Sequence, residues 1–185
     1  MIDLYLIIIY KIMAITELSN NVNTNKIVII SHDTLKNNNL KLFTDVIYKN
    51  FIHLSNNTEL KHTKQEIYKV LKSNNAQVYL IMKNKSIVSY LVGEITKLND
   101  GRNVLYITYL FTSDKFRNYG LASKLLKLSD EICSKNNLDG IMLVCDTEND
   151  YIYNFYLMKN FMPDMILRRY SKYDVLFKST RNNYL

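Results

Sequence analysis

The chain has 185 residues, of which 48% are hydrophobic and 22% charged, so it can bury the core of one ordinary globular domain. Its net charge of +7 would suit an anionic partner. The basic residues are scattered, however, and no dense Lys/Arg block or nucleic-acid recognition motif is present, which favours a dispersed lysine surface over a nucleic-acid interface.

The first 25 residues contain the one apolar run that could suggest a membrane. It reads MIDLYLIIIYKIMAI, and Asp3, Lys11 and Glu17 bracket a stretch much shorter than the roughly 20 apolar residues that a spanning helix needs. No small-residue cleavage site follows it. We expect an N-terminal extension, residues 1–25, that packs on the domain as an extra strand or helix, and a cytoplasmic protein without membrane contact.

The next part of the chain predicts one strand and two helices. KIVIIS at 26–31 is rich in β-branched residues, as strands are. Apolar residues then recur at helical spacing between Phe43 and Leu54. A second helix is predicted in HTKQEIYKVLKSN, where Thr63 and Glu66 have the spacing of a capping box.

Three strand-like runs follow, AQVYLIMK, SIVSYLVGEIT and NVLYITYLFT. The short polar segments NKS (84–86) and NDG (99–101) separate them, and both predict tight hairpin turns. The sequence therefore predicts a three-stranded antiparallel ribbon between residues 76 and 112.

Beyond residue 112 the pattern alternates between helices and strands. A helix is predicted from the apolar face of Leu121, Leu125, Leu128 and Ile132, and GIMLVCD (140–146) predicts a strand buried on both faces. Residues 150–160 predict a helix that ends near Pro163. MILRRY (165–170) and YDVLFK (173–178) then predict a closing hairpin.

The predicted order is β-α-α-β-β-β-α-β-α-β-β, in a single domain over residues 26–185. A β-α-β crossover among antiparallel hairpins indicates an α/β fold. We expect a mixed, mostly antiparallel sheet of about seven strands with helices on both faces. Cys133 and Cys145 lack metal or CxxC spacing and predict two buried free thiols, with a nucleophilic cysteine as the alternative.

Gly120, one of only four glycines, stands where a helix begins in FTSDKFRNYGLASKLL. A glycine there serves either a tight turn or the close approach of a ligand. The first N–H groups of a helix lack partners, and with the helix dipole they favour a phosphate. Arg117 adds a cation and Ala122 is small, so Arg117-x-x-Gly120-x-Ala122 suits a pyrophosphate.

This segment resembles the signature of the Gcn5-related N-acetyltransferases (GNAT), Arg/Gln-x-x-Gly-x-Gly/Ala, which grips the pyrophosphate of coenzyme A. ENDYIYNFYLMKNF (148–161) resembles the family's N-x-x-A-x-x-x-Y-x-K-x-G-F segment, with Asn149, Tyr156 and Phe161 at matching positions. Asn160 stands at the usual glycine, and asparagine tolerates a left-handed backbone. The motifs cover residues 104–161. Two residues differ from the family pattern: Tyr153 stands near the usual small residue of the second helix, and Asp114 replaces a frequent proline.

The resemblance implies a GNAT fold, acetyl-CoA as acetyl donor, and no metal. LYITYLFT would pair through its backbone with the pantetheine arm, as an added strand, and the neighbouring IMLVC would splay away to admit the cofactor. The implied cofactor-binding residues are Leu110, Phe111, Thr112, Arg117, Asn118, Tyr119, Gly120, Leu121, Ala122, Ser123, Asn149 and Tyr156.

The resemblance also implies that a neutral primary amine attacks the thioester directly in a ternary complex. Tyr156 would protonate the departing thiolate, the alternative being a packed aromatic residue, and the amide of Leu110 would donate to the thioester carbonyl.

The general base has several candidates. Alternation along the strand puts Tyr106 on one face with Thr108 and Leu110. Tyr106 matches a tyrosine base of some protein N-terminal acetyltransferases, whose companion histidine is missing here because Val144 stands near that place. Glu94 and a relayed water are the other candidates.

The acceptor amine, on a small molecule or a protein, is left open by the sequence. The short RRYSKYD segment predicts an open acceptor groove, and Arg168 and Arg169 either attract an acidic acceptor or are solvated edge charges. A polyamine would find carboxylates in DTEND (146–150). The alternatives are an inactive acyl-CoA-binding module and, with less support, a basic nucleic-acid-binding domain. We expect a monomer or homodimer.

Overall fold

The computed structural model describes residues 26–30, 40–54, 60, 62–83 and 86–181. The expected packing of residues 1–25 therefore lies outside the described residues. The elements are β1 (Lys26–Ile30), α3 (Leu40–Asn50), the 3-10 turn η1 (Ile52–Leu54), α4 (Lys64–Lys72), β2 (Ala76–Lys83), β3 (Ser86–Lys97), β4 (Asn103–Thr112), the 3-10 turn η2 (Asp114–Phe116), α5 (Leu121–Lys135), β5 (Gly140–Asp146), α6 (Asp150–Leu157), β6 (Met162–Pro163) and β7 (Tyr173–Ser179).

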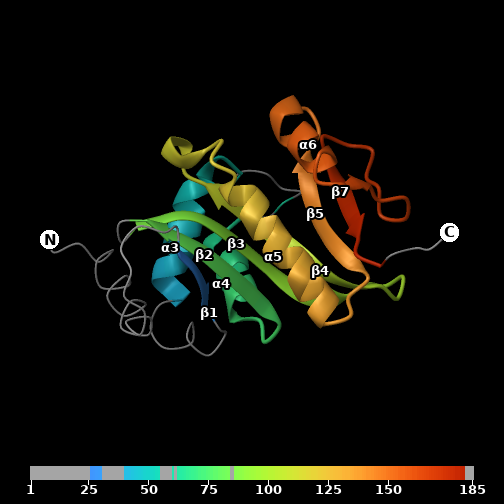
Figure 1. Ribbon diagram of the computed structural model, residues 1–185, viewed down its shortest axis with the longest axis horizontal. Coiled ribbons are helices and arrows are strands. Elements are labelled where there is room, and N and C mark those ends of the chain that lie inside the picture. Colours follow the sequence, from blue (N-terminus) through green and yellow to red (C-terminus); the bar gives the residue numbers. More distant parts are fainter. Residues whose placement is uncertain (1–25, 31–39, 55–59, 61, 84–85, 182–185) are drawn as a thin grey trace, which may run out of the picture.

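Seven strands of the described chain form one sheet, in the order β1-β2-β3-β4-β5-β7-β6 (Figure 1). The pair β4–β5 is parallel and the other neighbouring pairs are antiparallel. The predicted mixed, mostly antiparallel sheet is thus confirmed, with α3 and α4 packed on one face and α5 and α6 on the other.

Local sequence explains several of the element boundaries. Thr63 caps α4, because its Oγ1 accepts a hydrogen bond of 3.2 Å from the amide of Glu66, as the capping-box spacing predicted. Gly101 has φ +92° in the β3–β4 hairpin. Asn160 has φ +64° after α6, the left-handed backbone expected at that position.

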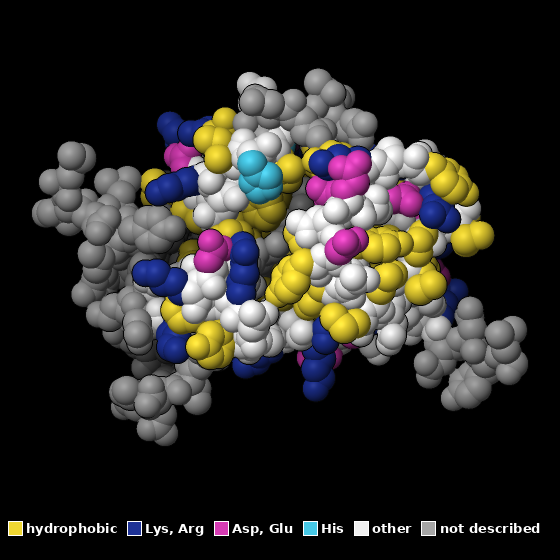
Figure 2. Space-filling model, turned by 90° about the horizontal axis from the view of Figure 1, so that it is seen from above, with side chains coloured by type: hydrophobic (Ala, Val, Ile, Leu, Met, Phe, Trp, Pro, Cys, Tyr) yellow, Lys and Arg dark blue, Asp and Glu magenta, His cyan; other side chains and the backbone are white. Residues whose placement is uncertain are grey.

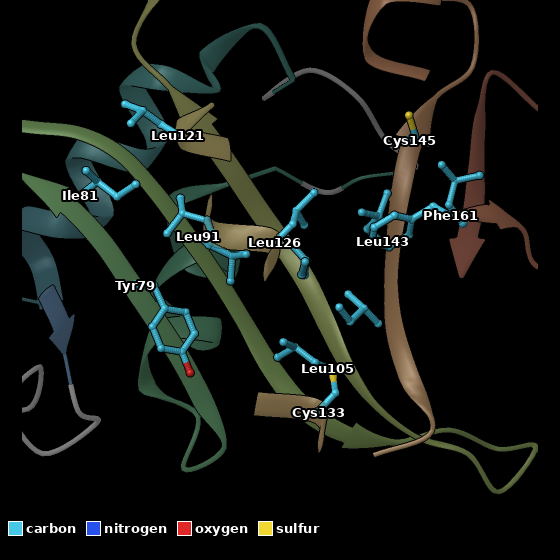
Figure 3. Packing of buried hydrophobic residues seen from close by; sticks show 14 of the residues in the cluster. Tyr79, Ile81, Leu91, Leu105, Leu121, Leu126, Cys133, Leu143, Cys145 and Phe161 are labelled. Carbon is cyan, nitrogen blue, oxygen red and sulfur yellow. The ribbon is translucent and has the colours of Figure 1, made fainter. Parts of the chain in front are cut away.

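The larger core lies between the sheet and α5 (Figure 3). Helix α5 contributes Leu121, Leu125, Leu126 and Cys133, all buried, whereas Leu128 and Ile132 are only half-buried. The second core joins α3 and α4 to the other face of β2, β3 and β4. Strand β5 supplies side chains to both faces, as its continuous apolar sequence predicted.

A β-bulge in β4 changes which side chains face each core. Val92 of β3 pairs with Tyr109 and Gly93 pairs with Ile107, so Thr108 is the extra residue. Gly93 is required here, since a Cβ at this residue would lie 2.5 Å from the carbonyl oxygen of Tyr106. The side-chain alternation of β4 is therefore reversed after Thr108.

The C-terminal hairpin differs from the prediction. MILRRY (165–170) is not a strand; β6 consists of Met162 and Pro163, and residues 164–172 form a loop. The Asp164 carboxylate accepts the amides of Ile166 and Leu167 at 3.0 and 2.6 Å. These side-chain bonds take the place of a strand ladder. The preceding helix ends at Leu157, earlier than expected.

Candidate functional site

Strands β4 and β5 are hydrogen-bonded along only part of their length and then separate. They pair from Val104 with Gly140 to Ile107 with Leu143 and no further. Beyond these residues β4 remains paired with β3 through Thr112, while β5 remains paired with β7. The sheet therefore opens between β4 and β5, and a hollow lies between the two halves of the molecule when viewed from above (Figure 2).

Backbone amides of β4 point into this opening. Ser113 N donates to Val88 O at 2.9 Å, which makes residues 113 and 88 a hydrogen-bonded pair. Because such pairs alternate along antiparallel strands, Phe111 and Tyr109 also bond to β3, whereas Leu110 and Thr112 direct their amides towards β5. The two amides that the sequence singled out thus face the gap.

The loop before α5 presents a run of free N–H groups next to the opening. Asn118 and Gly120 both have left-handed backbones, with φ +65° and +73°. Within the described residues no acceptor takes the amides of residues 118–123; Lys124 is the first to bond, at 2.9 Å from Gly120 O. Successive amides of this kind, at a helix N-terminus, form an anion-binding concavity.

Side chains around this loop have different surroundings. Leu121 is buried in the core, so only its amide can reach a ligand, whereas Tyr119 is 74% exposed. Ala122 and Ser123 are half-buried on the first turn of α5. A Cβ at Gly120 would meet no atom within 4 Å, so the space above the loop is open.

Polar contacts hold the loop in place. Arg117 forms an exposed ion pair of 2.6 Å with Asp114. The Tyr151 hydroxyl of α6 donates to Oδ1 of Asn118 at 2.8 Å, and so links α6 to the loop. Oδ1 of Asn149 accepts the amide of Ile152 at 3.2 Å and caps α6. This capping accounts for Asn149 structurally and leaves its side-chain NH2 available.

Tyr156 lies on the α5/α6 face, close to the end of β5. It is half-buried, with its ring packed edge-on against Phe155 and Phe161 at centroid distances of 5.3 and 5.5 Å. Burial, and to a lesser extent the nearby Cys145, raises the pKa of its hydroxyl. The phenol therefore keeps its proton at neutral pH and can serve as a hydrogen-bond donor or an acid.

Tyr106 lies on the opposite face of the sheet. It pairs across the strands with Glu94 and packs with the small cluster of Val104, Met142 and Val175. Burial raises the pKa of Tyr106; the charge of Arg169 opposes this and that of Glu94 adds to it.

The expectation that Tyr106, Thr108 and Leu110 share a face is wrong. Leu110 packs in the core beneath α5, on the face opposite to that of Tyr106. The reason is the bulge, whose extra residue is Thr108 itself. The remaining residues of the predicted cofactor strand are packed, with Phe111 stacked on Tyr90 at 5.2 Å and Thr112 Oγ1 bonded to Ser89 Oγ at 2.8 Å.

The two cysteines are free and buried, as expected. Burial raises the pKa of each thiol to about 12, with Asp130 adding to the effect at Cys133 and Asp146 at Cys145. Both therefore remain thiols, which does not favour the nucleophilic alternative. In the described residues, no group of three or more His, Cys, Asp or Glu could hold a metal, and no helix is long and apolar enough to cross a membrane.

One histidine of the α3–α4 connection, His62, lies next to β4 without having been predicted as a site residue. His62 is 4% exposed, and its ring lies against Tyr109 of β4 and Phe51, at centroid distances of 5.2 and 5.5 Å. Its only local signal was a position directly before the helix cap Thr63. Nothing in the sequence indicated that this histidine would reach the strand next to the opening.

Solved structures with the same fold were found by structural comparison. Acetyltransferase of the GNAT family from Staphylococcus aureus Mu50 matches with 21% identity and a TM-score of 0.58, covering 84% of this chain and 100% of its own. PaiA N-acetyltransferase from Thermoplasma acidophilum, solved with coenzyme A, matches with 14% identity and a TM-score of 0.59, covering 83% and 99%.

Arabidopsis thaliana Naa50, solved with the bisubstrate analogue CoA-Ac-MVNAL, matches with 21% identity and a TM-score of 0.59, covering 83% of this chain and 98% of its own. No curated protein sequence matched the chain. The sequence model of the acetyltransferase (GNAT) family matches residues 45–161, well over half of the chain. Taken with the opening between β4 and β5, this match shows that the chain belongs to the GNAT family of acetyltransferases.

Proposed function

We propose that the chain transfers the acetyl group of acetyl-CoA to a primary amine, by direct attack of the amine in a ternary complex. The observation that carries the proposal is the opening between β4 and β5 beyond Ile107 and Leu143, with unpaired amides on two of its sides. These amides suit a ligand that is an extended amide chain at one end and a pyrophosphate at the other.

The pyrophosphate would lie on the amides of residues 118–123, with the dipole of α5 and the charge of Arg117 favouring its negative charge. The pantetheine arm would pair with β4 through the outward amide of Thr112, which leaves the outward amide of Leu110 for the thioester. Asn149 can donate to the same arm through its free NH2, because its carbonyl oxygen already caps α6.

The chemistry requires a donor for the developing oxyanion and a proton for the leaving thiolate. The amide of Leu110 faces the opening and is the proposed oxyanion donor. Tyr156 is the proposed acid, since its raised pKa keeps the proton on the hydroxyl until a thiolate forms. Its place on the α5/α6 face puts the leaving group on that side of the sheet.

The acceptor amine would then approach from the α3/α4 face, where Glu94 and Tyr106 stand opposite one another. The Glu94 carboxylate can hold an ammonium group, and Tyr106 can accept a hydrogen bond from it. Because its pKa is raised, Tyr106 stays protonated at neutral pH, and its phenolate form is not available as a base. The acceptor class remains a small-molecule amine or a protein amino group; the peptide moiety of the analogue bound to the Naa50 structure supports testing peptides first.

The test is to incubate the purified protein with acetyl-CoA and a panel of primary amines, and to detect N-acetylated product by mass spectrometry. The panel contains the peptide Met-Val-Asn-Ala-Leu, spermidine and 2-phenylethylamine. Enzyme-dependent acetylation of one of them establishes the transferase. Saturable acetyl-CoA binding without product from any amine would instead favour an inactive acyl-CoA-binding module.

A further inference from the structure

His62 has an unusual environment for a histidine. Its side chain is 4% exposed, and Nε2 is buried with no hydrogen-bond partner among the described residues. Leaving a buried polar atom without a partner costs about 1–3 kcal/mol, so native proteins rarely do it without a functional reason. The hydrogen-bonding capacity of this nitrogen is therefore not used by any described residue.

His62 packs against the residue that precedes the proposed oxyanion donor on β4. The ring contacts Tyr109 edge-on, at 5.2 Å and 73°, and both rings contact Phe51. Tyr109 is the first residue after the bulge and directly precedes Leu110, the proposed oxyanion donor. It also lies on the same face as Tyr106, the face from which the amine would approach. His62 and Tyr156 are thus on opposite faces of the sheet, on either side of the opening.

We propose that His62 is the general base of this site and takes a proton from the acceptor amine through Nε2. This proposal rests on the transferase function proposed above. In that role the imidazole must be neutral at working pH and must stand on the acceptor side of the thioester. The contact with Tyr109 puts His62 on the α3/α4 face, the side proposed for the acceptor.

The electrostatic environment of His62 meets the requirement for neutrality. Burial lowers the pKa of His62 from its ordinary value of 6.5, and the charge of His53 on η1 lowers it further. Tyr109 of β4 is neutral, because burial and the charges of Glu66 and Tyr106 raise its pKa. Two carboxylates lie on this side: Glu66 of α4, whose charge acts on Tyr109, and Glu94 of β3, whose charge acts on Tyr106. His62 is therefore an uncharged imidazole at neutral pH.

Each proton released in the proposed reaction has an acceptor. One N–H bond of the substrate ammonium breaks and an Nε2–H bond forms on His62. The freed nitrogen attacks the thioester carbonyl carbon, and the resulting tetrahedral adduct breaks its C–S bond. The thiolate takes the proton of Tyr156. The second proton of the nitrogen returns to Tyr156 through water, and His62 releases its own proton to solvent.

The experiment compares wild type, His62→Gln and His53→Gln with the three amines named above. Coenzyme A release is followed with a thiol reagent from about pH 5.5 to about pH 10, a range that spans the ordinary pKa values of histidine and of an amine. His53 is a matched control, since it is exposed and its ring stacks on the same Phe51 at 6.3 Å. The free energy of unfolding of each variant is measured in parallel.

We expect His62→Gln to lower kcat/KM about 10²–10³-fold at neutral pH, the usual contribution of a general base. The loss should shrink towards pH 10, where the amine deprotonates without help. As the pH falls, wild type should lose activity around the pKa of His62, which is below 6.5. This loss of activity in acid should be absent from His62→Gln. His53→Gln should match wild type at neutral and higher pH; its loss of activity in acid should lie at a higher pH than that of wild type, because the His53 charge that lowers the pKa of His62 is gone.

Two other results have distinct meanings. If amines are acetylated and His62→Gln loses the same factor at every pH, or none, His62 is not the base. If acetyl-CoA binds but no amine is acetylated by wild type, the transferase function fails and the role of His62 fails with it. Should His62→Gln not fold, His62→Phe suits the aromatic surroundings and removes the same nitrogen, so the comparison can still be made.

Discussion

Tyr106 and Leu110 lie four residues apart on β4, and their side chains pack on opposite faces of the sheet. The extra residue between them, Thr108, reverses the alternation. As a result β4 presents a tyrosine to the α3/α4 face and, past the bulge, turns the amide of Leu110 into the opening. In the proposed mechanism, the bulge thereby separates the side of the acceptor from that of the leaving group.

The bulge depends on Gly93, and we predict that Gly93→Ala destabilises the protein. The added methyl group would lie 2.5 Å from Tyr106 O, a backbone atom that cannot move without disturbing the strand. Overpacking of this kind costs about 1–3 kcal/mol. Urea unfolding measures the change. Gly101→Ala is the control for backbone strain without overpacking: it has open space but φ +92°, so it should cost about 1–2 kcal/mol from strain alone. Equal stabilities for Gly93→Ala and wild type would contradict the close approach.

The hydrogen bond from Tyr151 to Asn118 holds the loop whose amides face the proposed pyrophosphate. Tyr151→Phe should therefore weaken acetyl-CoA binding by about two- to tenfold, the value of one net hydrogen bond. Isothermal titration calorimetry measures the affinity. Tyr68→Phe, at an exposed tyrosine of α4, should bind as wild type does. An unchanged affinity in Tyr151→Phe would mean that the loop holds its shape without α6.

Tyr156→Phe should lower kcat while leaving acetyl-CoA affinity near that of wild type. The substitution keeps the ring contacts with Phe155 and Phe161 and removes only the acidic proton. The expected loss is about 10²-fold or more, as for other general acids. Tyr153→Phe, one turn earlier on the same helix, is the matched control. If both variants turn over like wild type, Tyr156 is a packing residue.

Two carboxylates, Asp164 of the β6–β7 loop and Asp174 of β7, make the free energy of unfolding depend on pH in acid. Burial alone would raise the pKa of Asp164 and Asp174. In each case hydrogen bonds to the carboxylate outweigh the effect of burial on the pKa. Asp164 accepts hydrogen bonds from Arg102 and from the amides of Leu167 and Ile166. Asp174 accepts them from the amides of Arg169 and Val175 and from the side chain of Arg168. Both pKa values are lowered from the ordinary 3.8.

A lowered pKa in the folded state adds stability above the unfolded value and loses it as the pH falls through the folded value. We therefore predict that the free energy of unfolding declines below about pH 4, in the range where unfolded aspartates titrate. Asp164→Asn should lower the free energy of unfolding by about 1.5–3 kcal/mol at neutral pH, since Arg102 loses its buried charged partner and keeps only Asp100 among its described ion-pair partners. The free energy of unfolding of Asp164→Asn should also decline less steeply with falling pH than that of wild type. A decline as steep as that of wild type would exclude Asp164 as a source of the pH dependence.

Local signals in the sequence were sufficient for much of the fold and for the cofactor loop. Thr63, Gly120 and Asn160 each act within a few residues of the chain, through a cap or a left-handed backbone, so sequence patterns identify them. The family motifs added the identity of the ligand that the loop would hold.

Features that depend on distant parts of the chain could not be predicted in this way. The bulge at Thr108 exists because β3 approaches closely at Gly93, and period-two alternation assumes an uninterrupted ladder. Residues 165–170 have strand-like composition, yet Asp164 binds their amides while it also pairs with Arg102. The burial of His62 follows from the face to which Tyr109 points, which the bulge determines.

The central claim is that acetyl-CoA binds at the amides around Gly120. The most direct test is a calorimetric titration of wild type, Gly120→Glu and Gly101→Glu with acetyl-CoA. Both glycines have a positive φ and open space at Cβ, so the two substitutions strain the backbone alike and differ in their distance from the amides. We predict one saturable site in wild type and in Gly101→Glu, and no binding in Gly120→Glu, whose carboxylate would repel the pyrophosphate. Binding of equal affinity in Gly120→Glu, or no binding in wild type, would contradict the account.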